Sequence, residues 1–167
     1  KGFQGEDMSA PGKVCACIKH FAGYGGALAG RDYNTVELSE HTFREFYLKS
    51  YKAGIDAGAG MVMTSFNTVN GIPASTNRQL MRDILREEMG FNGVIITDAS
   101  RMAGFTCMEK RSLAVPKCIA SGCDVFLFSS DMEEDFQYMM DGVKNGIITE
   151  ERLNDALHRI LGLKAKL

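Results

Sequence analysis

The sequence lacks tryptophan, long apolar runs and any strong excess of charge. No apolar stretch approaches the roughly 20 residues that a membrane-spanning helix needs, which argues against an integral membrane protein. The formal net charge of the 167 residues is −2. Nucleic acid and anionic membrane surfaces are bound by clustered lysine and arginine, so this balance argues against both as the main partner. With 45% hydrophobic and 24% charged residues, the composition is that of an ordinary globular domain.

The start of the chain also lacks both an initiator methionine and the apolar core of a signal peptide. We therefore expect the start of the gene product to lie upstream of residue 1. The five cysteines are an odd number, and neither a second close pair nor a His-x-His pattern accompanies Cys15 and Cys17. These features predict neither a metal site nor a disulfide framework. They favour small, buried thiols in a reducing compartment, and hence the cytoplasm.

Continuously apolar runs alternate with helical patterns along the chain. Strands are expected at 14–18, 61–66, 93–98 and 124–128, and helices at 39–58, 76–89, 111–120, 130–146 and 149–163. The spacing of the strands is that of successive βαβ units, and strands that are apolar on both faces are typical of a parallel sheet covered by helices. No linker, repeat or low-complexity tract divides residues 1–167, so we expect a single domain without an internal boundary.

The helix boundaries follow from capping residues and apolar stripes. Three of the helices are predicted to begin at capping residues. These are Ser39, Ser130 as the first residue of a capping box, and Thr149. In the last helix, the leucines and isoleucine at positions 153, 157, 160 and 161 form the predicted buried stripe. The segment 67–75 is expected to be a loop, because it contains the turn formers Asn70-Gly71 and Pro73.

Four βα units are half of an eight-stranded barrel, which needs about 250 residues. Four parallel strands alone leave two unpaired edges and one uncovered surface. The fold is therefore predicted to be α/β, either an open sheet or the second half of a TIM-type (β/α)8 barrel that pairs with missing strands. In the second case the partner is the other barrel half or a second copy of the chain.

In parallel α/β folds the chemistry gathers at the carboxyl ends of the strands. The third predicted strand ends at Asp98 and the first at Lys19-His20. A carboxylate at this position can also serve as the cap of an Asx-turn, and this structural interpretation stays open. Neighbouring residues of a strand point to opposite faces, so bringing Lys19 and His20 into one pocket requires a local distortion of the backbone.

Several spaced motifs resemble glycoside hydrolase family 3. They are KHFAGYG (19–25), GRDYN (30–34), AGAGMVMTSFN (57–67), NGIPA (70–74) and the segment from LR (85–86) to GFNGVIITD (90–98). These motifs occur in the family's order and cover the first hundred residues densely. The segments 123–128 and 149–163 resemble the end of the same catalytic barrel. The resemblance therefore favours the half-barrel over the open sheet.

The resemblance implies a role for each site residue. Asp98 is expected to be the nucleophile of a retaining β-glycosidase, which forms a covalent glycosyl intermediate. Lys19 and His20 are expected to bind sugar hydroxyls, with an unusual cis peptide between them. Met63 and Phe66 are expected to line the pocket, and Arg31 of the second motif to bind substrate. The implied substrate is a β-linked glucoside or related oligosaccharide, and no cofactor or metal is implied.

The sequence departs from the family at three places. Phe66 stands where many members have tyrosine, and Ala99-Ser100 follow the nucleophile where many have a tryptophan platform. The N-acetylglucosaminidase branch takes its acid/base from an Asp-Ser-His loop after the first motif, whereas no histidine lies between that motif and His41 here. This favours the glucosidase and xylosidase branch and leaves the acid/base unidentified. We therefore expect the chain alone to be inactive.

Two other functions remain possible on the sequence alone. One is a barrel lyase that forms a Schiff base through Lys19. The other is a non-catalytic half-barrel that serves as an assembly or carbohydrate-binding module.

Overall fold

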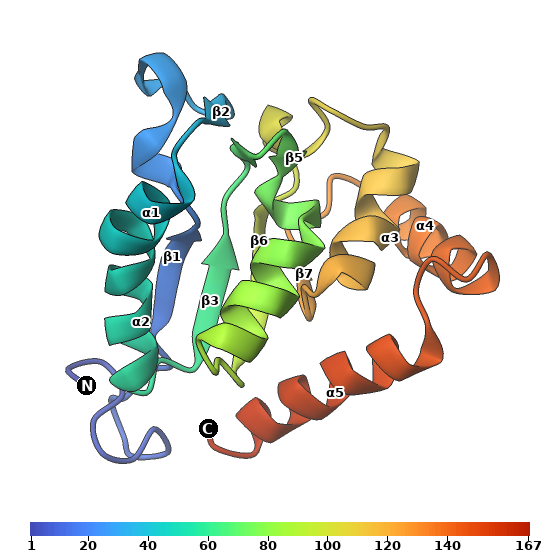
Figure 1. The fold of residues 1–167 in the computed structure, drawn as a ribbon. Coiled ribbons are helices and arrows are strands. Elements are labelled where there is room, and N and C mark those ends of the chain that lie inside the picture. Colours follow the sequence, from blue (N-terminus) through green and yellow to red (C-terminus); the bar gives the residue numbers. More distant parts are fainter.

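The computed structural model describes residues 1–167, and a sheet of four parallel strands lies at its centre (Figure 1). The strands are β1 (Cys17–Phe21), β3 (Met61–Thr64), β6 (Val94–Ala99) and β7 (Val125–Leu127). They pair in chain order, β1-β3-β6-β7, and every pair is parallel. Parallel neighbours need crossover connections, and helices provide them here. The predicted parallel α/β architecture of about four strands is confirmed.

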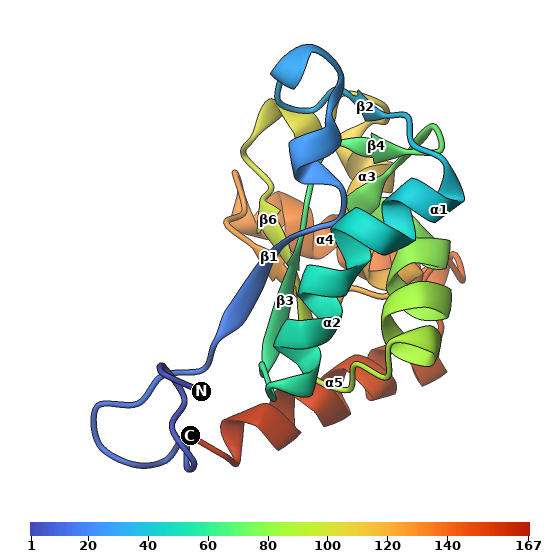
Figure 2. The same ribbon diagram turned by 60° about the vertical axis from the view of Figure 1, so that its left-hand side comes forward.

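Helices connect the strands and cover one face of the sheet. They are α1 (Glu40–Thr42), η3 (Phe43–Leu48), α2 (Lys49–Asp56), η5 (Gln79–Glu88), α3 (Arg111–Ser121), α4 (Met132–Lys144) and α5 (Glu150–Lys164), with short turns η1 (Tyr24–Gly26), η2 (Leu28–Gly30), η4 (Ala74–Thr76) and η6 (Ala103–Phe105). Figure 2 shows α1 and α2 on the same side of β1 and β3. Both chain ends lie near the amino ends of the strands, where α5 crosses below them (Figures 1 and 2).

The hydrophobic core lies between the sheet and these helices. Val62 and Ile95 from neighbouring strands and Leu85 from η5 are fully buried there. Helix η5 begins where the Asn77 side chain accepts the Leu80 N–H and ends at Gly90, whose φ of +72° needs a glycine. The capping residues Ser39 and Thr149 are confirmed, because each side chain accepts the N–H three residues later.

The segment 67–75, predicted to be a loop, contains two strands. β4 (Thr68–Val69) and β5 (Ile72–Pro73) form a hairpin, and β4 also pairs with β2 (Thr35–Val36). Asn70 and Gly71 between them both have positive φ, as the tightest hairpin turns require. This small sheet depends on a partner strand more than thirty residues away, so local composition did not reveal it.

The first strand lies three residues later than predicted and is not fully buried. It is an edge of the sheet, because it pairs with β3 only. Cys17 is therefore exposed and Cys15 half-buried, and Cys107 in a loop is also exposed. The expectation of buried thiols is confirmed only for Cys118 and Cys123.

The predicted burial of several apolar residues is also wrong. The α5 leucines 153, 157 and 161 are exposed, and the buried positions of this helix are instead Arg152 and Ala156. Helix α4 is capped by Asp131 and not by Ser130, and it presents a second exposed stripe. That stripe consists of Met132, Phe136, Met140 and Val143. Hydrophobic periodicity identified the helices, but not which surface covers their apolar faces.

Candidate functional site

Asp98 lies at the carboxyl end of β6, and its side chain approaches that of His20 from the end of β1, although β3 lies between the two strands. Its Oδ2 is 3.5 Å from Nε2 of His20, and the two side chains are 22% and 25% exposed. Its Oδ1 accepts the Ala99 N–H at 2.7 Å. This bond joins adjacent residues and is not that of an Asx-turn, because the N–H two residues on, that of Ser100, donates to the Leu127 carbonyl. The second oxygen of Asp98 faces the histidine. A partly accessible carboxylate at this edge of the sheet is placed to react with a ligand.

Lys19 and His20 are brought to this edge by an irregular end of β1. The peptide bond between them is cis, as the resemblance implied, and so is the bond between Phe21 and Ala22. The pairing of β1 with β3 shifts register between Ile18 and Phe21. The backbone carbonyl of His20 accepts a hydrogen bond from the Tyr51 hydroxyl, which ties the site to α2.

The surroundings of His20 favour its neutral imidazole, because they lower its pKa. Its burial lowers its pKa below the ordinary range, the charge of Lys19 lowers it further, and Asp98 offsets part of this effect. A neutral imidazole has one N–H donor and one free nitrogen. It can therefore take part in hydrogen bonds with hydroxyl groups in either sense.

The glycine-rich loop after β1 contributes aromatic and acidic side chains. The Tyr24 ring lies 5.3 Å from the ring of His20, and its hydroxyl donates a hydrogen bond to Oδ1 of Asp32. This bond raises the pKa of Tyr24 to about 12. The Asp32 carboxylate thus binds Tyr24 and not its sequence neighbour Arg31. Arg31 is exposed in the same loop.

Met63 and Phe66 lie on and just after β3. Met63 is half-buried, whereas Phe66 is 2% exposed and belongs to the hydrophobic core. Its ring lies 5.8 Å from the ring of Phe105. A substrate contact of Met63 or Phe66 stays a prediction.

Sequence reasoning did not single out a group of buried polar atoms at the end of β3. Thr64 Oγ1, Ser65 Oγ and Asn67 Oδ1 are buried without a hydrogen-bond partner. Such groups are uncommon in folded proteins and are costly to bury. Their place directly after an apolar strand was the available signal, because strand ends of this kind are where α/β folds gather functional residues.

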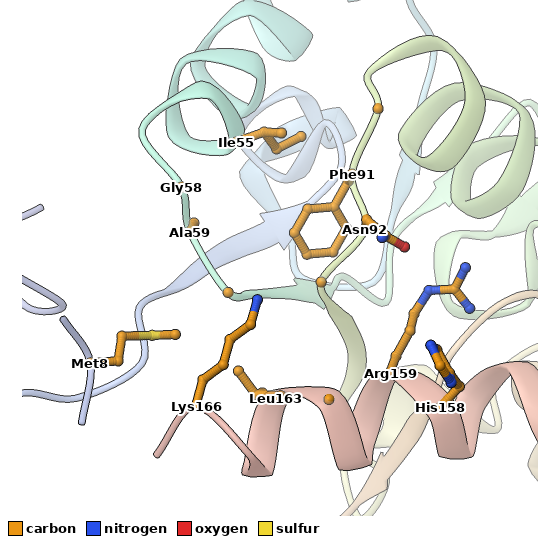
Figure 3. A pocket seen from close by; sticks show the side chains of 14 residues that line it. Met8, Ile55, Gly58, Ala59, Phe91, Asn92, His158, Arg159, Leu163 and Lys166 are labelled. Carbon is orange, nitrogen blue, oxygen red and sulfur yellow. The ribbon is translucent and has the colours of Figure 1, made fainter. Parts of the chain in front are cut away.

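The structure has a separate cavity of about 420 Å³ at the opposite end of the sheet (Figure 3). Gly60 and Gly93, which precede β3 and β6, line it together with Phe91, Arg159 and Lys166. The cavity therefore lies at the amino ends of the strands and far along them from Asp98. No group of three or more metal-binding side chains is present, and no helix is long and apolar enough to span a membrane.

Comparison with known proteins places this arrangement in a family. The model of the glycosyl hydrolase family 3 N-terminal domain matches residues 1–163. The chain belongs to this family. Its four parallel strands are consistent with half of the family's (β/α)8 barrel domain.

The relatives are considerably longer than this chain. A beta-N-acetylglucosaminidase/beta-glucosidase of Cellulomonas fimi is 37% identical over 97% of the chain, which spans 31% of that protein. A beta-glucosidase of Listeria innocua in complex with isofagomine matches with a TM-score of 0.89 and 37% identity, over 99% of this chain and 24% of that one. A beta-glucoside phosphorylase bound to 2FGlc matches with a TM-score of 0.87 and 35% identity, over 92% of this chain and 30% of that one. The chain thus spans about a quarter to a third of these proteins.

Proposed function

We propose that this chain provides the nucleophile half of the catalytic barrel of a retaining β-glycosidase that acts on β-glucosides or β-xylosides. The observation that carries the proposal is the Asp98 carboxylate at the carboxyl end of β6, 3.5 Å from His20. The family membership and the names of the relatives, which include beta-glucosidases and a beta-xylosidase, support it.

In the first step, a carboxylate oxygen of Asp98 attacks the anomeric carbon of the sugar. The bond from that carbon to the leaving oxygen breaks, and the leaving oxygen takes the electron pair and a proton from a general acid. In the second step, water attacks the same carbon, gives up a proton to the general base and releases Asp98. Lys19 and His20 bind sugar hydroxyls, with Arg31, Met63 and Phe66 around them. The acid/base group comes from outside the four strands described here.

We also propose that the missing part of the barrel covers the open surfaces of this chain. Strands β1 and β7 are unpaired edges, which in isolation favour association with other strands. The apolar stripes of α4 and α5 are also exposed. Exposed apolar surface of this extent is typical of an interface. The chain alone is therefore expected to associate and to show no turnover.

Trapping the covalent intermediate tests the proposal. The complete enzyme that contains this chain is treated with an activated 2-fluoro-β-glucoside and digested, and the labelled peptide is identified by mass spectrometry. The label is expected on Asp98. The Asp98→Asn variant should remain unlabelled, whereas Asp83→Asn, a matched change on the surface of η5, should label normally. A label on another residue, or no label with an active enzyme, would refute the assignment.

Phosphate is a second candidate acceptor in place of water. The similarity to a beta-glucoside phosphorylase favours this variant of the reaction. Release of glucose 1-phosphate in phosphate buffer, compared with glucose in a phosphate-free buffer, distinguishes the two. Both reactions use the same covalent intermediate on Asp98.

Two further observations distinguish the remaining alternatives. Borohydride trapping of a carbonyl substrate on Lys19 would support a lyase. Sugar binding without labelling or turnover in the complete protein would support a non-catalytic module.

A further inference from the structure

A buried ion pair connects the first turns of α3 and α4. The Arg111 Nε donates to Oδ1 of Asp135 at 2.7 Å, and its Nη2 donates to Oδ2 at 2.5 Å. The two side chains are 17% and 5% exposed. This is the bidentate geometry in which arginine binds a carboxylate most strongly. The pair is therefore a rigid link between the two helices.

The position of Arg111 is not explained by local helix preferences. It is the first residue of α3, where the positive end of the helix dipole disfavours a cation. Asp135 lies in the first turn of α4, where an anion is favoured, but it is buried and bonded to Arg111 instead of exposed to solvent. The reason for the pair must lie in its tertiary contacts.

Those contacts converge on Ser100, two residues after Asp98. Arg111 Nη1 donates to the Ser100 carbonyl at 2.9 Å, and Nη2 donates to the Ser100 hydroxyl at 3.0 Å. The hydroxyl in turn donates to the carbonyl of Phe128, and the Ser100 N–H donates to the carbonyl of Leu127. Ser129 adds a hydrogen bond to Asp135. The loops that follow β6 and β7 are therefore joined at one guanidinium group.

Two aromatic rings fix the plane of this guanidinium. Its carbon lies 5.7 Å from the ring centre of Phe105 and 5.8 Å from that of Phe126. The two rings pack edge to face, 5.5 Å apart. Cation–π contacts add to the hydrogen bonds, so Arg111 has little freedom to reorient.

We propose that Arg111 and Asp135 are positioning residues for Asp98, an inference that rests on the proposed function. Arg111 holds the Ser100 carbonyl and hydroxyl, and the preceding residue, Ala99, presents the N–H that binds Asp98 Oδ1. With Oδ1 held in this way, Oδ2 faces His20. Loss of the guanidinium frees the loop and lets the carboxylate rotate away from the line of attack. A misplacement of about 1 Å at a reacting group costs about 100-fold in rate.

The test measures inactivation of the complete enzyme by the 2-fluoro-glucoside as the separate constants kinact and Ki. For Arg111→Ala we expect kinact to fall about 10- to 100-fold, with Ki changed by less than about threefold, since ground-state binding is retained. Arg111→Lys should recover only a minor part of the lost kinact, because an ammonium group cannot reproduce the planar, two-pronged hydrogen bonding of the guanidinium. Added guanidinium ion should restore kinact in Arg111→Ala. Arg101→Ala, which removes an exposed cation beside Ser100, is the matched control.

The outcomes separate this inference from the proposed function. If the unmodified enzyme is not labelled on Asp98, the proposed function fails. If it is labelled and Arg111→Ala reacts at the rate of Arg101→Ala, the positioning role is overturned. If Arg111→Ala does not fold, Ser100→Ala replaces it, because this change removes only the hydroxyl bonds to Arg111 and Phe128. An unchanged kinact in a folded Ser100→Ala variant would then overturn the proposal.

Discussion

Asp124 is the residue whose replacement tests most directly what holds the sheet together. Its side chain is fully buried just before β7 and accepts hydrogen bonds from Arg86 at 2.6 Å and from the Ile95 N–H at 2.9 Å. Arg152 of α5 donates to its other oxygen. One carboxylate thus joins η5, β6 and α5, and it pairs with two cations.

The expected cost of Asp124→Asn follows from these two cations. The amide keeps the shape of the side chain and can still accept the Ile95 N–H, but it leaves the charge of Arg86 without an anionic partner. Arg152 loses one of its two carboxylate partners and keeps its pair with Asp155. Burial already lowers the pKa of Arg86 to about 10, an effect that the charge of Asp124 partly offsets. Removing one partner of a buried ion pair costs about 3–5 kcal/mol. This is a large share of a total stability of about 5–15 kcal/mol.

Urea unfolding followed by circular dichroism at neutral pH measures this cost. The midpoint should fall strongly while the slope m stays constant, because the surface exposed on unfolding is unchanged. Asp56→Asn is the matched control, since it breaks only the exposed pair with Lys52 and should cost less than about 0.5 kcal/mol. A loss in Asp124→Asn within about 1 kcal/mol of this control would refute the argument that the buried cations depend on Asp124.

Three further predictions concern packing, pH and thiol chemistry. Gly93→Ala should destabilise the protein by about 2 kcal/mol or more in thermal unfolding, because the added Cβ would lie 2.3 Å from the Gly60 carbonyl oxygen. Gly162→Ala is the control in helix α5, where the space around the glycine is open, and it should stabilise the protein by about 0.5–1 kcal/mol. The pKa of His20 is lowered in the folded state, so its contribution to stability is present above pH 6.5 and is lost as the pH falls below that value. In denaturation measured as a function of pH, the His20→Gln variant should therefore lose less stability than the unmodified protein between about pH 7.5 and about pH 5.5. A thiol reagent should modify the exposed Cys17 and Cys107 before Cys118, which is fully buried and should react only on unfolding. Burial raises the pKa of the Cys118 thiol to about 12. Rapid modification of Cys118 under native conditions, measured by mass spectrometry, would contradict its burial.

The sequence was sufficient to predict the four parallel strands, although β1 lies three residues later than expected, because each is a largely apolar run that is bounded by turn residues. It also placed Asp98, Lys19 and His20 at one edge, since the carboxyl ends of parallel strands meet there. Helix starts at Ser39 and Thr149 followed from local capping chemistry. All these features depend on neighbours within a few residues or on the regular geometry of βα units.

Tertiary structure decided everything that depends on distant partners. The strand pair β2–β4 joins segments more than thirty residues apart, and the edge position of β1 exposes Cys17. The apolar stripes predict that α4 and α5 are helices, but not that these apolar faces are exposed on the chain. Asp135 is a buried partner of Arg111 because α3 packs against α4, although acidic residues in the first turn of a helix are usually exposed to solvent. A local pattern predicts an element, whereas only the packing of elements determines which charges and apolar faces meet.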